Sequence, residues 1–246
     1  MKNKFLAAGI ALACALSMPA SQAGVSLSRT RIVFDGKHKE ASVIVNNDGD
    51  EALIQAWLDP LDDASPAVLP FAITPPLARL PANRQQMLRV LYEGVGVPSD
   101  RESAFWLNVQ EIPQSVVGEN VLQLAVRQRI KVFYRPVNLK GEPQQAPASL
   151  RWKFVRRGGS TLLHVENPSV YHVTIVDADL RSVSTAARVI DAKMIAPGAS
   201  ADVPVNVPEN VRESELAYQV MNDFGGRDRY HVTLSTGEAH TPVEAR

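Results

Sequence analysis

The residues of this chain that could do chemistry do not form a recognisable catalytic motif. The sequence contains no G-x-S-x-G, no H-E-x-x-H, no Walker loop and no G-x-G-x-x-G. Five histidines are spread along the chain, at His38, His164, His172, His231 and His240. A metal site would need ligands brought together by the fold, and a carbohydrate-active enzyme would need a convergent carboxylate pair that no spacing indicates. The sequence therefore predicts a protein that is not an enzyme and that has no metal site and no cofactor.

One stretch combines alternating apolar residues with a row of basic side chains. Asn120–Pro136 reads NVLQLAVRQRIKVFYRP, and every second residue from Leu122 onward is apolar apart from one glutamine. This period of two predicts a β-strand much longer than the usual length of about six residues. The basic residues, Arg127, Arg129, Lys131 and Arg135, all lie in its second half.

The first half of this predicted strand has two open interpretations. Its apolar side chains could line the core of a β-sandwich, which is the common role of an alternating strand. Alternatively, this half is a partly exposed sheet edge whose free N–H and C=O groups pair with another chain. Soluble proteins usually place charge or proline on such an edge. Leu122, Leu124 and Val126 have no charged residue among them, as expected if strand pairing with a partner is the purpose.

The first 23 residues are predicted to be a secretory signal peptide. Two lysines precede an apolar run, Phe5–Leu16, and the small residues of Ser21–Ala23 precede a mature chain that starts near Gly24. Cys14 lies in this run, but Ala11 stands where a lipoprotein signal would have leucine. We therefore expect export without lipidation.

The mature chain contains no cysteine, so an exported fold must be stabilised by its cores alone. About 223 residues suffice for two sandwiches of roughly 100 residues each. Without the two lysines of the signal, 24 basic residues stand against 26 acidic ones, a net charge near −2. This balance gives no indication of nucleic-acid binding.

The first predicted strand of the mature chain, Val25–Phe34, has an irregular alternation. Strict alternation would place Arg29 and Arg31 on a mostly apolar face. Either this is an edge strand whose arginines are solvated, or a kink turns Arg31 toward a site.

Composition divides the mature chain into two all-β units. Ser103–Ile112 is a predicted strand, and the seven residues Pro113–Glu119 connect it to the long strand as a hairpin. Val137–Ser149 holds Gly141, Pro143, Pro147 and two glutamines, a composition typical of a linker. About seven short predicted strands follow it. We expect an N-terminal domain over residues 24–139 and a C-terminal domain over residues 140–246.

Five motifs in order along the chain resemble the PapD-like periplasmic pilus chaperones. They are VSLSRTRIVFDG at the mature N-terminus, DRESAFWLNVQEIP at Asp100–Pro113, NVLQLAVRQRIKVFYRP at Asn120–Pro136, ENP at Glu166–Pro168 and NDFGG at Asn222–Gly226. The resemblance implies two immunoglobulin-like β-sandwich domains arranged as a boomerang. It also implies an ATP-independent periplasmic chaperone that folds and caps pilus subunits and delivers them to an outer-membrane usher.

The resemblance also implies roles for individual residues. Leu122, Leu124 and Val126 would be donated to the open groove of a subunit that lacks its last strand. Arg31 and Lys131 would bind the terminal carboxylate of the subunit in the cleft between the domains. An interdomain charge network would consist of Glu102, Arg135 and Asp223. The seven-residue loop is similar to that of the short-loop branch of the family.

Three expectations remain to be compared with the structure or tested in solution. Lys131 has the opposite parity to Leu122, Leu124 and Val126, so a twist or bulge would have to reconcile them. If the protein were instead a secreted tandem immunoglobulin-like adhesion module, those three apolar side chains would be covered. An exposed apolar strand would also favour self-capping as a homodimer when no subunit is bound.

Overall fold

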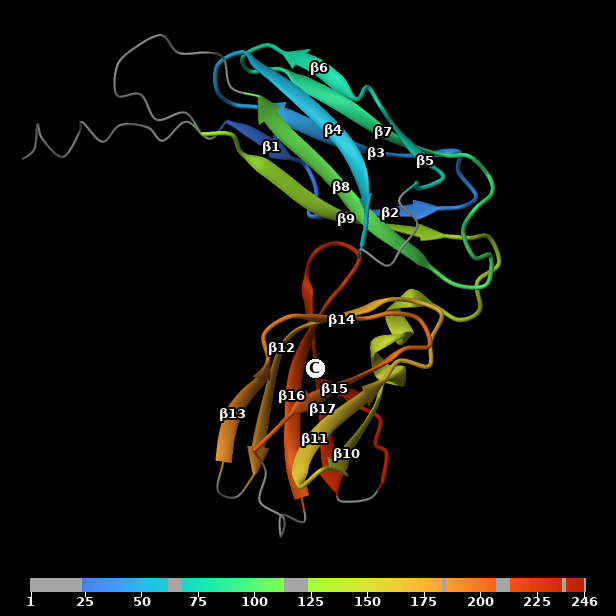
Figure 1. Cartoon of the computed structure of the whole chain (residues 1–246), viewed down its shortest axis with the longest axis vertical. Coiled ribbons are helices and arrows are strands. Elements are labelled where there is room, and N and C mark those ends of the chain that lie inside the picture. Colours follow the sequence, from blue (N-terminus) through green and yellow to red (C-terminus); the bar gives the residue numbers. More distant parts are fainter. Residues whose placement is uncertain are drawn as a thin grey trace, which may run out of the picture.

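Alternating apolar residues form two β-sandwiches, one from each half of the chain (Figure 1). The computed structural model describes residues 24–61, 68–112, 124–182, 185–206, 213–235 and 238–245. The predicted all-β fold with two sandwiches is confirmed. Within the described residues, no helix is long and apolar enough to cross a membrane.

The N-terminal sandwich consists of a four-stranded and a five-stranded sheet. The first has the order β1 (Val25–Leu27), β3 (Glu40–Asn47), β7 (Gln85–Tyr92), β5 (Phe71–Thr74). The second has the order β2 (Arg31–Asp35), β9 (Arg127–Arg135), β8 (Ser103–Ile112), β4 (Ala52–Pro60), β6 (Leu77–Leu80). Aromatic rings contributed by both sheets lie in the core between them, including Phe34, Phe71, Phe105 and Tyr134. This core holds the strands that carry the candidate site.

The C-terminal sandwich has its own core and follows two short 3₁₀ turns, η1 (Pro143–Gln145) and η2 (Pro147–Ser149). Its smaller sheet has the order β10 (Arg151–Arg157), β11 (Ser160–Glu166), β15 (Ser200–Pro204). The larger has the order β13 (Thr185–Ile190), β12 (Val173–Ser182), β16 (Glu213–Met221), β17 (Arg227–Ser235), β18 (Val243–Glu244), with β14 (Lys193–Ile195) also paired to β12. Trp152, fully buried, is among the largest side chains of this core.

The first predicted strand is in fact two strands in different sheets, so the prediction of a continuous strand over Val25–Phe34 is wrong. β1 pairs with β3 in one sheet, whereas β2 pairs in parallel with β9 in the other. Ser28–Thr30 carries the chain between the sheets, so the two halves have independent side-chain phases. Ile32 is buried in the core, and Arg31 lies on the opposite face of β2. Both open interpretations hold in part: β1 and β2 are edge strands and Arg29 is exposed, whereas the break at Ser28–Thr30 places Arg31 on the outer face of β2.

The long predicted strand corresponds in its second half to β9, which pairs with β8 as an antiparallel hairpin. Their register runs without interruption from the Ser103–Tyr134 pair to the Gln110–Arg127 pair, so the expected bulge is not found in the described part of β9. The opposite parity of Lys131 simply places it on the outer face. Leu122 and the loop Pro113–Glu119 lie outside the described residues.

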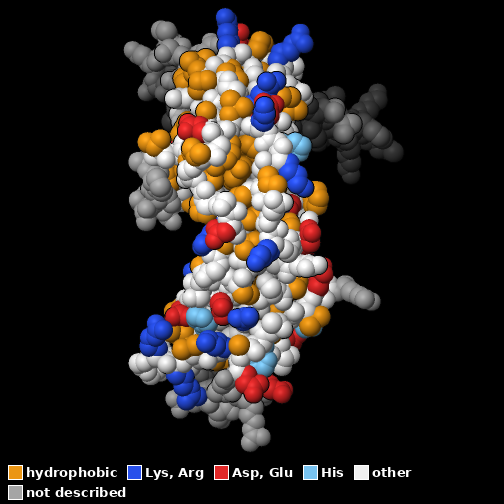
Figure 2. Space-filling view, turned by 90° about the vertical axis from the view of Figure 1, so that its right-hand side faces the viewer, with side chains coloured by type: hydrophobic (Ala, Val, Ile, Leu, Met, Phe, Trp, Pro, Cys, Tyr) orange, Lys and Arg blue, Asp and Glu red, His pale blue; other side chains and the backbone are white. Residues whose placement is uncertain are grey.

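The two sandwiches lie one above the other and meet at a junction, here called the waist (Figure 1 and Figure 2). On the face shown in Figure 2, apolar side chains cover much of the upper sandwich. The turn between β16 and β17 rises from the lower sandwich toward the upper one (Figure 1). At this junction the turn brings Gly225 next to Thr30 of the upper sandwich.

Candidate functional site

The outer edge of β9 is only half covered. On one side β9 pairs with β8 along its length, and Glu111 N–H donates to the carbonyl of Val126 just before it. On the other side β2 pairs only with the part from Lys131 to Arg135. Among the described residues, no strand pairs with that side of β9 upstream of Lys131. Followed along β9, the sheet therefore has an open edge that ends where the pairing with β2 starts, at Lys131.

The apolar side chains next to this open edge are exposed. Leu124 is 71% exposed and Val126 is 55% exposed. Their parity is that of Ile130 and Val132, which are buried in the core, so they extend the core-facing side of the strand beyond the sandwich. The core interpretation of this stretch fails at these two positions, and so does the covered arrangement that an adhesion module would require.

Arg31 and Lys131 lie together where the open edge ends. They are direct partners in the parallel register of β2 and β9, so both side chains project from the outer face of the sheet. The Lys131 ammonium lies 5.3 Å from the centre of the Trp106 ring. The Arg31 guanidinium lies 5.8 Å from the centre of the Phe133 ring. Aromatic faces stabilise a cation without neutralising its charge.

These two cations are partly desolvated and lack an anionic partner. Burial lowers the pKa of Arg31, and the negative charges of Asp223 and Glu102 offset part of this lowering. Burial also lowers the pKa of Lys131, and the charge of Arg31 lowers it further. Arg31 Nε is buried without a hydrogen-bond partner, and Nη1 lies 3.5 Å from the carbonyl oxygen of Met221. Within the described part of the chain, neither side chain forms an ion pair, so the site favours an added anion.

A carboxylate fits this pair of side chains chemically. The guanidinium has a planar fork of donors that matches two carboxylate oxygens, and the ammonium adds a compact point charge. No group of three His, Cys, Asp or Glu side chains among the described residues is arranged to hold a metal ion.

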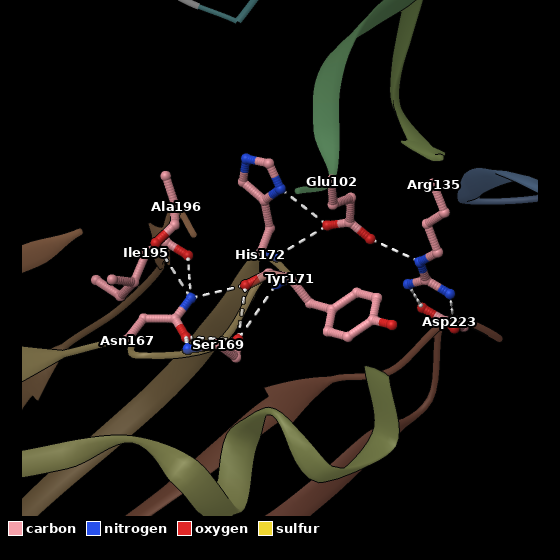
Figure 3. Close-up of polar contacts among 9 residues, drawn as sticks. All are labelled: Glu102, Arg135, Asn167, Ser169, Tyr171, His172, Ile195, Ala196 and Asp223. Carbon is pink, nitrogen blue, oxygen red and sulfur yellow. Dashed lines mark hydrogen bonds and ion pairs between the residues drawn. The ribbon is translucent and has the colours of Figure 1, made fainter. Parts of the chain in front are cut away.

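Arg135 connects the two sandwiches through a charge network (Figure 3). Its Nε donates to Glu102 Oε2 at 2.7 Å, and its Nη1 and Nη2 donate to the two oxygens of Asp223 at 2.7 and 2.8 Å. Burial opposes the charge on Arg135, but its hydrogen bonds and charge interactions with Asp223 and Glu102 prevail and raise its pKa. Glu102 precedes β8 in the N-terminal sandwich, and Asp223 lies in the β16–β17 turn, so one side chain bridges the waist.

His172 is a further member of this network that the sequence did not indicate. Its backbone N–H and its Nδ1 both lie 2.8 Å from Glu102 Oε1, and the carboxylate accepts from Nδ1 when the ring proton is there. Glu102 N–H also donates to the carbonyl of Val170. The segment before β12 thus binds Glu102, whose side chain is 1% exposed, through backbone and ring together. No local pattern around His172 could have revealed a contact made across 70 positions.

The buried Asn167 holds this segment in place from below (Figure 3). Its amide group donates to the carbonyl oxygens of Tyr171, Ile195 and Ala196, and its Oδ1 accepts from Ser169. The Glu166–Pro168 motif therefore supports the interdomain contact indirectly.

Two family models match this chain and together cover most of it. The model described as pili and flagellar-assembly chaperone, PapD N-terminal domain, matches residues 24–140. The model described as pili assembly chaperone PapD, C-terminal domain, matches residues 145–235. The geometry defines a class of two-sandwich proteins that have an open strand edge with a pair of cations at its end. The chain belongs to the PapD family of pilus assembly chaperones, as predicted.

Individual relatives agree with this assignment. The probable fimbrial chaperone LpfB of Escherichia coli O157:H7 is 40% identical over 233 residues, which are 92% of this chain and 94% of that protein. The crystal structure of the YadV chaperone has a TM-score of 0.74 at 36% identity and covers 86% of this chain and 100% of that one. A chain from the complex of the Salmonella enterica SafA pilin with the SafB chaperone has a TM-score of 0.69 at 28% identity, covering 86% and 97%. These relatives are named as chaperones and not as enzymes.

The charge network makes a testable prediction about the waist. Arg135→Leu leaves the buried Glu102 without its main cation, and we expect a loss of stability of about 3 kcal/mol. The domains should also lose their fixed angle. Thermal unfolding and small-angle X-ray scattering measure the two effects.

Arg101→Leu is the matched control, because Arg101 pairs with Asp100 at the surface, where the side chains are 51% and 67% exposed. Solvent screens such a surface pair, so its loss should change the stability far less than the loss of the Arg135 network. Equal effects of the two substitutions would show that the Arg135 network does not hold the waist.

Proposed function

We propose that this protein is a periplasmic chaperone that folds and caps fimbrial subunits and delivers them to an outer-membrane usher. It does so without catalysing a reaction. The observation that carries the proposal is the open edge of β9, flanked by exposed apolar side chains at Leu124 and Val126. Membership of a chaperone family supports it, as does the solved complex of a related chaperone with a pilin.

The mechanism follows from the backbone of an open edge. Free N–H and C=O groups upstream of Lys131 pair with a strand of the subunit, and alternate side chains enter its groove. Leu122, Leu124 and Val126 supply those side chains in this proposal. Arg31 and Lys131 bind the terminal carboxylate of the subunit and so fix the register of the pairing, because a shift of one residue would turn every side chain to the wrong face.

We further propose the placement and division of the chain. Residues 1–23 act as the signal peptide that directs export to the periplasm, and the N-terminal family match that starts at residue 24 supports this. Residues 24–139 and 140–246 form the two domains, with the Glu102, Arg135 and Asp223 network setting the angle between them. The separate buried cores of the two sandwiches support a division into two domains, and Leu139 packs against the C-terminal core.

Co-purification from periplasm with a co-expressed fimbrial subunit tests strand donation. The wild-type protein should recover a one-to-one complex, whereas Leu124→Glu should lose most of the subunit because a carboxylate would enter an apolar groove. Circular dichroism should show an unchanged fold, since Leu124 is exposed. Equal recovery by both proteins would mean that the subunit binds elsewhere on the chain and that strand donation through Leu124 is wrong.

Substitutions in the cleft test the carboxylate anchor separately. Arg31→Ala or Lys131→Met should lower recovery of the subunit by roughly tenfold or more, because each removes a charge-assisted hydrogen bond. The melting temperature should change little, since both side chains lie on the outer face of the sheet. Arg129→Met is the control, because Arg129 also lies over the Trp106 ring, at 4.3 Å, but does not neighbour Arg31. A large loss of thermal stability in the Arg31 or Lys131 variant would mean that these residues are structural.

The exposed edge should also be hidden when no subunit is present. We expect a homodimer that forms through Leu124 and Val126 as concentration rises, because an uncovered apolar edge is a template for pairing. Analytical ultracentrifugation should show this association, and Leu124→Glu should abolish it. A monomer at every concentration would rule out self-capping.

A further inference from the structure

A pocket lies between the two sandwiches beside Arg31. The wall that contains Phe224 has no role in the function described so far. Its volume is about 580 Å³, which falls within the range of roughly 300–1,000 Å³ typical of ligand sites. One wall is the connection between β1 and β2 together with Val33, and the other is Asp223–Gly225 from the β16–β17 turn. Each sandwich thus contributes one wall.

The β16–β17 turn presents Phe224 to this pocket in a defined way. Asn222 Oδ1 accepts hydrogen bonds from the N–H groups of Phe224 and Gly226, and Asp223 is held by both outer nitrogens of Arg135. Gly225 has a φ of 84°, and a Cβ there would lie 2.5 Å from Thr30 Oγ1. The turn therefore packs directly on the β1–β2 connection, and only glycine fits at the contact.

Phe224 is left in solvent by this arrangement. Its side chain belongs to neither core and is 93% exposed. Leu27 and Val33, both half-buried, add apolar surface to the opposite wall. An aromatic ring held in water beside other apolar groups is a feature of surfaces that bind a partner.

The charges beside the pocket indicate which part of a partner enters it. Arg31 lines the pocket with a buried Nε that has no hydrogen-bond partner. The only carboxylate among the lining residues, Asp223, is already bonded to Arg135. The available charge is therefore positive, which suits a carboxylate with an apolar group attached to it.

The position of the pocket is continuous with the open edge of β9. Arg31 is the first residue of β2 and the register partner of Lys131, where the open edge ends. A chain paired along that edge and running parallel to β9 would end at Arg31. Its last side chain would then be next to the pocket.

We propose that this pocket accepts the C-terminal side chain of the bound subunit and selects for an apolar one. Phe224, Leu27 and Val33 contact that side chain, and Arg31 binds the adjacent carboxylate. Phe224 is then a specificity-determining residue supplied by the C-terminal sandwich. This inference rests on the proposed function, because it assumes that a polypeptide C-terminus is anchored at Arg31.

Fluorescence anisotropy with labelled peptides tests the pocket on the mature protein. The probes are synthetic ten-residue peptides of alternating apolar and polar residues that are identical except for a final Leu, Gly or Asp, plus the Leu peptide as a C-terminal amide. The Leu peptide should bind about tenfold more tightly than the Gly peptide, because it buries an apolar side chain. The Asp peptide and the amide should bind more weakly than the Leu peptide.

Variants separate the pocket from the anchor. Phe224→Ala should reduce the preference for Leu over Gly to less than about threefold while leaving the Gly peptide unaffected, and Phe224→Leu should restore most of the preference. Val243→Ala, which removes another exposed apolar side chain on β18, should change nothing. Arg31→Ala should weaken all free-acid peptides alike.

The possible failures are distinguishable. Binding that needs the free carboxylate and Arg31 but does not differ between Leu and Gly overturns the pocket and leaves the proposed function standing. A preference for Leu that persists in Phe224→Ala also overturns it. If none of the peptides binds, both the pocket and the carboxylate anchor are contradicted.

Discussion

The passage of the first strand from one sheet to the other is the constraint on which the rest of the site depends. Because β1 pairs with β3 and only β2 reaches β9, the upstream part of β9 has no neighbour on its outer side among the described residues. The same passage places Arg31 at the first position of β2, opposite Lys131. It also brings Thr30 against Gly225 of the other sandwich. One change of sheet thus creates the open edge, the pair of cations at its end and a contact across the waist.

Ion pairs and charge-assisted hydrogen bonds of Arg135 bridge the waist. Replacing a buried ion pair with packed apolar side chains is often neutral or stabilising, so stability alone does not explain Arg135. Two apolar surfaces can slide past each other without losing their contact. The two outer nitrogens of the Arg135 guanidinium, in contrast, bind both oxygens of Asp223 in one orientation, and Nε donates to Glu102 at the same time. Glu102 is in turn held by His172. Such directional bonds restrict the relative orientation of the sandwiches, and in the orientation observed Arg31 and the β16–β17 turn line the same pocket.

The sequence predicted strands such as Ser103–Ile112 correctly because each sandwich buries one face of its sheets, which imposes a period of two. It failed at Val25–Phe34 because that pattern reports the phase of a strand and not which sheet it joins. The irregular alternation at Arg29 and Arg31 was the sequence signal of this passage from one sheet to the other.

Other parts of the site could not come from periodicity at all. The roles assigned to Glu102, Arg135 and Asp223 came from resemblance to a family, since contacts across the waist leave no local pattern. His172 was missed for the same reason, because packing between distant segments creates its contact with Glu102.

The two faces of β9 explain how such an edge can be open and still selective. Arg129 and Lys131 lie over Trp106 on the outer face, so that face carries positive charge. Leu124 and Val126 extend the opposite, core-facing side, which is apolar and uncharged at these two positions. A second strand can pair there favourably only if it offers apolar surface to one face and tolerates cations on the other. Random aggregation through the edge would meet both conditions rarely, whereas an incomplete sandwich that ends in a carboxylate meets both at once.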